Sequence, residues 1–276
     1  MSITIGALVS AQEITPESLA GLKDMGFEGI SISFWEQIGK TDLASLAKIA
    51  DKAQLPVTAL SIWGNPLAND LTLAGWKTLI QSASLFGKPF VTGFAGRIPN
   101  GSVEESLMRW KQVFSMLLED AYHFDCRGLL MENCRIGDVW KRGKWNIAIN
   151  DAAWELLFST LDDEKLGLEW EPCHQVESMV DPLPQLERWK NRILHVHGKD
   201  AHIDWDFLHT IGLYSPQKAI FPTLPGKGDT DWKALIQILS KSGFSGSIDV
   251  ETEEPSFFTN PTQKAEALAY LKACRL

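Results

Sequence analysis

Short apolar runs alternate with amphipathic stretches about eight times along the chain. The apolar runs have the length of buried strands, and the stretches between them repeat with the spacing of helices. Strands are expected over residues 3–9, 27–34, 56–62, 89–94, 128–131, 167–170, 193–196 and 245–250. Helices are expected from residue 15 onward and over residues 41–53, 71–86, 102–124, 152–161, 184–189, 231–240 and 262–273.

Regular alternation of strand and helix is typical of right-handed βαβ units and a parallel sheet. Eight such units in a chain of 276 residues favour closure into a barrel over an open, doubly wound sheet. No glycine-rich phosphate-binding fingerprint follows the first strand, which also argues against the open sheet. The sequence therefore predicts an α/β fold, a (β/α)8 TIM barrel, in a single domain over residues 1–276.

Two connections, residues 135–150 and 201–229, are longer than the usual link between a strand and a helix. Both are rich in aromatic and charged residues, and both leave the C-terminal ends of strands, where barrel enzymes place their sites. We interpret them as segments that cover a pocket.

Charge and composition indicate which classes of binding partner are disfavoured. The formal net charge of −9 disfavours general nucleic-acid binding. No apolar run approaches the roughly 18 residues of a membrane span, and no secretory signal is recognisable, so a cytoplasmic protein with no membrane partner is expected. The four cysteines form no CxxC pair, which favours reduced thiols over disulfides.

Four consecutive predicted strands end in acidic or imidazole side chains: Glu132, Glu171, His197 and Glu251. The C-terminal ends of neighbouring barrel strands converge, so these side chains are expected to meet. Three carboxylates would repel one another unless a cation lay between them. The set suits one divalent metal ion, Mn²⁺, Mg²⁺ or Co²⁺, and tolerates Zn²⁺. The competing interpretation is four unrelated surface residues, because a single glutamate at a strand end is usually solvated or paired.

Five further residues are candidates for substrate contact, and each has an ordinary alternative as a packing, buried structural or surface residue. His174 follows Glu171 by three residues, and His195 lies on the same side of its strand as His197. The five candidates are His174, His195, Lys199, Arg97 and Trp63.

Residues 225–229 are predicted to form a glycine-rich turn. Such a turn could hold an anion through backbone N–H groups, although most glycine-rich turns have no ligand.

At these residues the chain resembles the sugar phosphate isomerase/epimerase family, part of the xylose isomerase-like barrel superfamily. The matching stretches are residues 132–134, 171–174, 195–200, 225–232 and 248–255. The resemblance implies one divalent metal held by Glu132, Glu171, His197 and Glu251, with His174 meeting substrate oxygens. In the related ketose epimerases, the glutamates matching Glu132 and Glu251 also move protons at the carbon next to a carbonyl.

Four positions depart from the family pattern. Glu171 stands where the family usually has Asp, and Cys173 where it usually has Ser. Thr252 replaces a frequent His, and Glu253 replaces a frequent Asp. One extra methylene at Glu171 must change how that carboxylate approaches the metal.

The expected function is a metal-dependent isomerase or epimerase acting on a small carbohydrate through an enediolate. The alternatives are a keto-sugar or keto-cyclitol dehydratase or lyase on the same site, an apurinic endonuclease, and a non-catalytic carbohydrate-binding barrel. Six histidines and a net charge of −9 disfavour the endonuclease. The sequence leaves open whether the substrate is phosphorylated and whether the protein forms a homo-oligomer.

Overall fold

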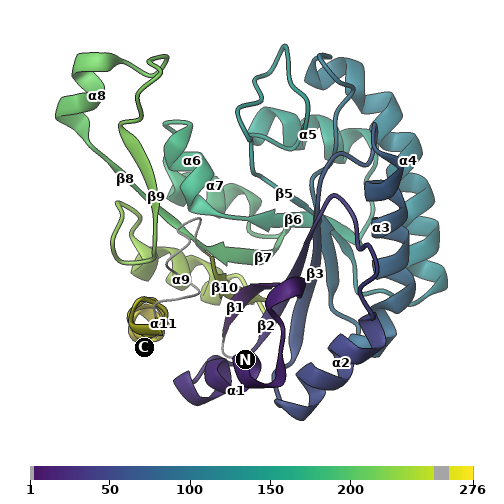
Figure 1. Ribbon diagram of the computed structural model, residues 1–276. Coiled ribbons are helices and arrows are strands. Elements are labelled where there is room, and N and C mark those ends of the chain that lie inside the picture. The colour runs from purple at the N-terminus through teal and green to yellow at the C-terminus, as the bar shows by residue number, and fades with distance from the viewer. Residues whose placement is uncertain (1–2, 252–260, 276) are drawn as a thin grey trace.

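Eight parallel strands close into a barrel in the computed structural model, which describes residues 3–251 and 261–275. The order around the barrel is β1-β10-β7-β6-β5-β4-β3-β2 (Figure 1). The predicted (β/α)8 fold is confirmed. The barrel strands are β1 (Thr4–Ser10), β2 (Ile30–Trp35), β3 (Val57–Trp63), β4 (Phe90–Gly93), β5 (Leu129–Glu132), β6 (Leu166–Trp170), β7 (Ile193–Gly198) and β10 (Ser247–Val250).

Helices surround the barrel, and local sequence signals set where several of them begin. Thr15 and Ser102 each form a capping box in which the side chain accepts from the third helical N–H. The helices are α1 (Pro16–Met25), α2 (Leu43–Lys52), α3 (Asp70–Ser82), α4 (Val103–His123), α5 (Asp151–Thr160), α6 (Pro172–Glu177), α7 (Pro182–Trp189), α9 (Trp232–Lys241) and α11 (Pro261–Arg275), with short 3₁₀ turns η1 (Ala11–Glu13) and η2 (Ala83–Phe86).

The hydrophobic core lies between the barrel and its helices. Along each strand, residues that face this layer alternate with residues that face the barrel interior. The outward residues are apolar, for example Ile62 on β3 and Trp170 on β6. Buried polar side chains occupy inward positions: Ser31, Ser61, Thr92, Glu169, His195 and Asp249. Inside the barrel, Ala59, Phe90 and Leu130, with Leu194 packed against them, form a separate small apolar cluster.

The second long connection has a structure of its own. Residues 201–229 were expected to cover a pocket. In the structure, β8 (Asp200–Ile203) and β9 (Ile220–Thr223) form an antiparallel hairpin that carries α8 (Trp205–Ile211) and projects from the barrel (Figure 1). Ala201, Ile203 and Leu208 form its buried side. Tyr214 is fully exposed, so this aromatic residue does not line a pocket.

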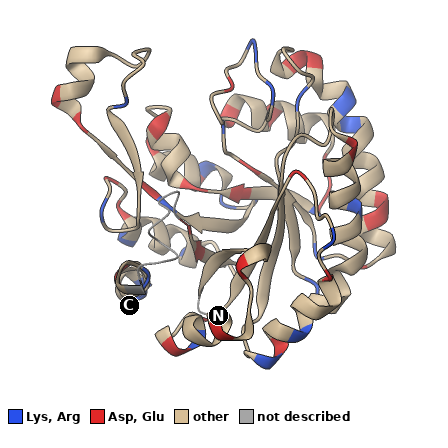
Figure 2. Ribbon diagram, in the orientation of Figure 1, with Lys and Arg blue, Asp and Glu red and all other residues tan. Residues whose placement is uncertain are grey.

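Lysine and arginine are interspersed with aspartate and glutamate over the outer helices (Figure 2). Within the described residues, none of the helices is both long and apolar enough to traverse a lipid bilayer. All four cysteines are free thiols, as the sequence predicted.

Candidate functional site

Four neighbouring strands bring the predicted metal ligands together. Glu132 ends β5, Glu171 follows β6, His197 lies in β7 and Glu251 follows β10. One ligand atom from each residue lies within 4.8 Å of the others. Ligands on opposite sides of a divalent ion lie roughly 4–5 Å apart, because metal–oxygen bonds are about 2.0–2.6 Å long. The four side chains can therefore touch one common ion.

These side chains are also buried without the hydrogen bonds that buried carboxylates need. Glu132, Glu171 and His197 are at most 2% exposed. One carboxylate oxygen of Glu132, one of Glu251 and both of Glu171 accept no hydrogen bond from the described residues. Buried carboxylate oxygens without partners cost several kcal/mol each, and ion-pair contacts with His174, His197 and Lys199 offset part of that cost. A hard divalent cation would satisfy them, so the donor set fits the ion that the sequence predicted.

The protonation of the cluster reflects this crowding of acidic groups. Burial, helped by Glu169 and Glu171, raises the pKa of Glu132 to about 7, although His197 opposes the shift. Burial alone would lower the pKa of His197, but the charges of Glu169 and Glu251 raise it well above its ordinary value. Without a cation, protons bound to His197 and Glu132 thus offset part of the negative charge of the cluster.

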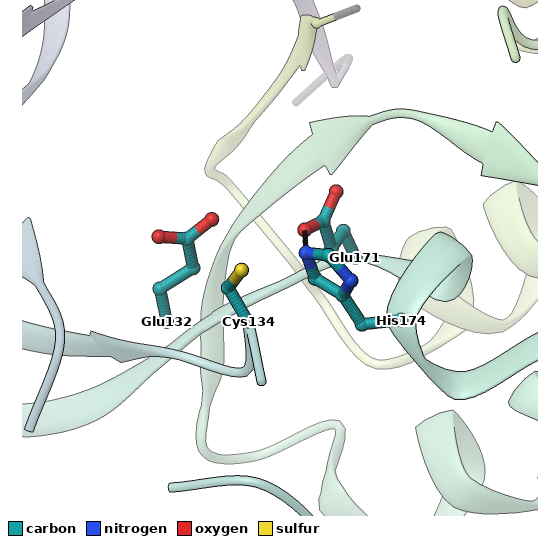
Figure 3. A group of neighbouring side chains, drawn as sticks. All are labelled: Glu132, Cys134, Glu171 and His174. Atoms are coloured by element: carbon teal, nitrogen blue, oxygen red, sulfur yellow. Dashed lines mark ion pairs between the residues drawn. The ribbon is translucent and has the colours of Figure 1, made fainter. Parts of the chain in front are cut away.

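His174 lies beside the cluster, on α6 (Figure 3). Its Nε2 is 2.5 Å from Glu171 Oε1, and its Nδ1 is 2.7 Å from Glu177 Oε2. The carboxylate of Glu177 fixes the ring with Nε2 towards the pocket. Sequence reasoning missed Glu177, although its position one helical turn after His174 was a usable signal.

Lys199 forms another wall of the site. Its Nζ lies 3.3 Å from Glu251 Oε1 and 3.6 Å from Glu171 Oε2, and the side chain is 2% exposed. The alternative that Lys199 is a solvated surface residue is wrong, and the next residue, Asp200, is not at the surface either. Asp200 is fully buried and accepts from the backbone N–H groups of Ala201 and Thr230 and the indole N–H of Trp232.

Two of the remaining candidates lie close to His197. Trp63 meets the His197 ring edge-on, with ring centroids 6.4 Å apart. His195 lies deeper inside the barrel, where its Nε2 is 3.0 Å from Asp249 Oδ2. Glu169, which sequence reasoning missed, faces the same interior, and its spacing of two residues from Glu171 could have revealed it.

The structure does not bring Arg97 to the cluster. Its guanidinium donates to the carbonyls of Gly101, Val139 and Trp140 and lies 3.8 Å from Asp138. A buried guanidinium needs such partners, and here they tie the 135–150 segment to the barrel. Arg97 thus has a structural role at this position.

The glycine-rich turn at residues 225–229 packs against Asp200. A Cβ on Gly228 would lie 2.4 Å from the Asp200 carboxylate, and Lys227 pairs with Glu266 at 3.0 Å. This close packing explains the glycine without an anion. Of the resembling stretch over residues 248–255, Thr252, Glu253, Glu254 and Pro255 lie outside the described residues.

Comparison with known proteins agrees with this architecture. An inosose dehydratase from Lacticaseibacillus casei is 32% identical over 121 residues, which cover 42% of this chain and 41% of the relative. Another, from Geobacillus thermodenitrificans, is 28% identical over 204 residues, 67% of this chain and 64% of the relative. The matches thus span less than two thirds of these relatives.

Solved structures show the same fold at low sequence identity. A xylose isomerase domain protein from Planctomyces limnophilus superposes with a TM-score of 0.78 at 17% identity, covering 100% of this chain and 98% of that one. An L-ribulose 3-epimerase gives 0.71 at 17% identity, covering 99% and 96%. The profile of the family described as "Xylose isomerase-like TIM barrel" matches residues 19–274. The chain therefore belongs to the xylose isomerase-like TIM barrel family.

Proposed function

We propose that this protein is a divalent-metal-dependent isomerase or epimerase that moves a proton next to the carbonyl of a small carbohydrate. The observation that carries the proposal is the meeting of four ligand atoms within 4.8 Å, in a buried cluster where four of the six glutamate oxygens accept no hydrogen bond from the described residues. Relatives that are dehydratases and epimerases support an enzyme of this chemistry.

Glu132, Glu171, His197 and Glu251 would hold the ion. When bound, the ion supplies Lewis-acid polarisation of a carbonyl or hydroxyl oxygen, which stabilises negative charge on the substrate.

Glu132 and Glu251 would move the proton. Glu132 ends β5 and Glu251 follows β10, and these strands are separated by β6 and β7 in the barrel, so the two carboxylates approach the site from different sides. A carboxylate on each side of the reacting carbon can remove the proton from one face and return it to the other. Trp63, at the end of β3, would close the pocket beside His197.

His174 and Lys199 would bind substrate oxygens. The imidazole is oriented by Glu177, and the ammonium lies against Glu171 and Glu251 in a buried position. Both can donate hydrogen bonds to hydroxyl or carbonyl oxygens of a sugar.

A dehydratase acting on a keto-cyclitol or keto-sugar is the second candidate, and the identity to inosose dehydratases favours it. The first step, proton removal next to a carbonyl, is the same. The reactions diverge afterwards: an epimerase returns the proton, whereas a dehydratase expels a neighbouring hydroxyl as water.

Solvent deuterium exchange tests the proposal. Metal-reconstituted protein would be incubated in D₂O with ketoses, their phosphates and keto-cyclitols, with Glu132→Gln as the control. Deuterium incorporation with a stereoisomeric or isomeric product supports the isomerase or epimerase, and loss of water supports the dehydratase. No exchange into any member of the panel would contradict both and favour a non-catalytic carbohydrate-binding barrel.

A further inference from the structure

Three ionisable side chains lie inside the barrel below the candidate ligands. Glu169 on β6, His195 on β7 and Asp249 on β10 are each at most 1% exposed. Glu169 pairs in register with His195, and Asp249 pairs with His197. Branched apolar side chains usually fill a barrel interior. Three ionisable groups at these positions therefore call for a specific reason.

The two ring nitrogens of His197 face different groups. Nδ1 lies 2.9 Å from Glu251 Oε2 and 3.4 Å from Glu132 Oε1, on the side of the candidate ligands. Nε2 lies 3.2 Å from Glu169 Oε1, on the side of the barrel interior. A neutral imidazole carries its proton on one nitrogen and a free lone pair on the other. If Nε2 carries the proton, the lone pair of Nδ1 points at the cluster.

Glu169 is suited to select that arrangement. The side chain of Glu169 is fully buried, its Oε1 is the atom that faces Nε2 of His197, and neither carboxylate oxygen accepts a hydrogen bond from any other described residue. An ionised carboxylate can only accept hydrogen bonds, so it favours the N–H form of the nitrogen that faces it. Burying a carboxylate is costly unless a hydrogen-bond donor pairs with it, and the N–H of His197 would be that donor.

Asp249 holds the ring of His195, which pairs in register with Glu169 on the neighbouring strand. His195 Nε2 is 3.0 Å from Asp249 Oδ2, and this oxygen accepts from Thr58 Oγ1 at 2.6 Å. Gly6 makes room for Asp249, because a Cβ there would lie 2.1 Å from Asp249 Oδ1. His195 and Asp249, which lie beside Glu169 inside the barrel, are thus held in place by contacts with neighbouring strands.

We propose that Glu169 is a positioning residue, which accepts the Nε2–H of His197 and so aims Nδ1 at the ion shared with Glu132 and Glu251. The inference rests on the proposed cation at that site. A carboxylate behind a ligating imidazole fixes the orientation of the ring and makes it a better ligand.

The test is the affinity for Mn²⁺ alone, measured by calorimetric titration of chelator-treated full-length protein. Glu169→Met removes the acceptor at similar volume, and we expect it to weaken Mn²⁺ binding by about 10–100-fold. Glu169→Gln keeps an acceptor oxygen, and its affinity should fall between those of Glu169→Met and the unsubstituted protein. Asp138→Asn alters another buried carboxylate, whose partners are the backbone N–H groups of residues 144–146 and Arg97 rather than His197, and it should leave Mn²⁺ affinity unchanged.

Melting curves without metal separate positioning from general stability. Weaker Mn²⁺ binding in Glu169→Met with a melting temperature close to that of Asp138→Asn supports the inference. Unchanged Mn²⁺ affinity in a folded Glu169→Met overturns it. If that variant does not fold, Glu169→Gln decides: weakened affinity supports the inference and unchanged affinity overturns it.

The readout also separates this inference from the proposed function. Binding is measured without substrate, so Mn²⁺ binding that depends on Glu169 would stand even if no deuterium exchange were found. An unsubstituted protein that binds no Mn²⁺ would overturn the inference together with the metal site.

Discussion

The outer faces of the barrel strands are apolar, whereas their inner faces carry most of the buried polar side chains beside one small apolar cluster. On the outside, Leu60, Ile62 and Trp170 are buried against the helices in one large apolar cluster. On the inside, Ser61 on β3 and Glu169 on β6 are equally buried but polar. Because side chains alternate along a strand, one segment serves both purposes. The comparison teaches that the outer layer stabilises the fold, while the interior supports the site.

The largest expected effect is on turnover, at the inner face. Glu132→Gln and Glu251→Gln should each lower kcat by at least about a thousandfold, or roughly 4 kcal/mol of activation free energy, because each removes a proton-transfer group. Steady-state rates and melting curves on the same samples check this. Glu155→Gln, at an exposed position of α5, is the control. A near-normal rate in either site variant would refute the two-carboxylate scheme.

An outer-face substitution should show the reverse pattern. Leu117, on α4, is fully buried, and Leu117→Ala should lower the free energy of unfolding by about 2–5 kcal/mol through lost burial and a cavity. Met108→Ala on the same helix is the control, because Met108 is 64% exposed. Urea titration measures stability, and kcat per folded molecule should be unchanged. A large loss of kcat with little loss of stability would break the comparison.

The smallest effect on stability is expected at Glu28, a partly exposed carboxylate that pairs with Arg275. Glu28 accepts from Ile5 N and from both terminal nitrogens of Arg275. Although partial burial raises the pKa of Glu28, these hydrogen bonds hold it below its ordinary value of 4.5. Its contribution is therefore present above pH 4.5 and is lost as pH falls through the lower folded-state pKa.

Glu28→Gln should consequently cost less than about 1 kcal/mol at neutral pH, and the difference should vanish in acid. Urea unfolding of Glu28→Gln and of the unsubstituted protein, from neutral pH down into acid, measures this difference in stability. A difference that grows as the pH falls would have the wrong sign.

The sequence was most informative where a pattern repeats. The alternation of strand and helix predicted the closed barrel, and the charged residues after four strands predicted the cluster that the structure assembles. Lys199 was left between pocket and surface, because one lysine after a strand carries no sign of what it faces. Its two carboxylate neighbours come from other strands, so only the fold reveals them.

Other features depended on contacts that sequence spacing does not encode. Arg97 follows a strand end like a pocket residue, but its partners are backbone carbonyls some 40 residues away, which carry no side-chain signal. The hairpin of β8 and β9 was missed because its strands are short and separated by α8. Glu169 was overlooked because a buried acidic residue inside a barrel contradicts the usual preference for apolar interiors.

The central claim is that one divalent ion is shared by Glu132, Glu171, His197 and Glu251. Calorimetric titration of chelator-treated protein with Mn²⁺ tests it most directly, together with melting curves. We predict one bound equivalent and stabilisation of about 2.7 kcal/mol at a free Mn²⁺ concentration of 100 times Kd. Binding should be strongly weakened in His197→Ala. No heat of binding and an unchanged melting curve at millimolar Mn²⁺ would contradict the claim.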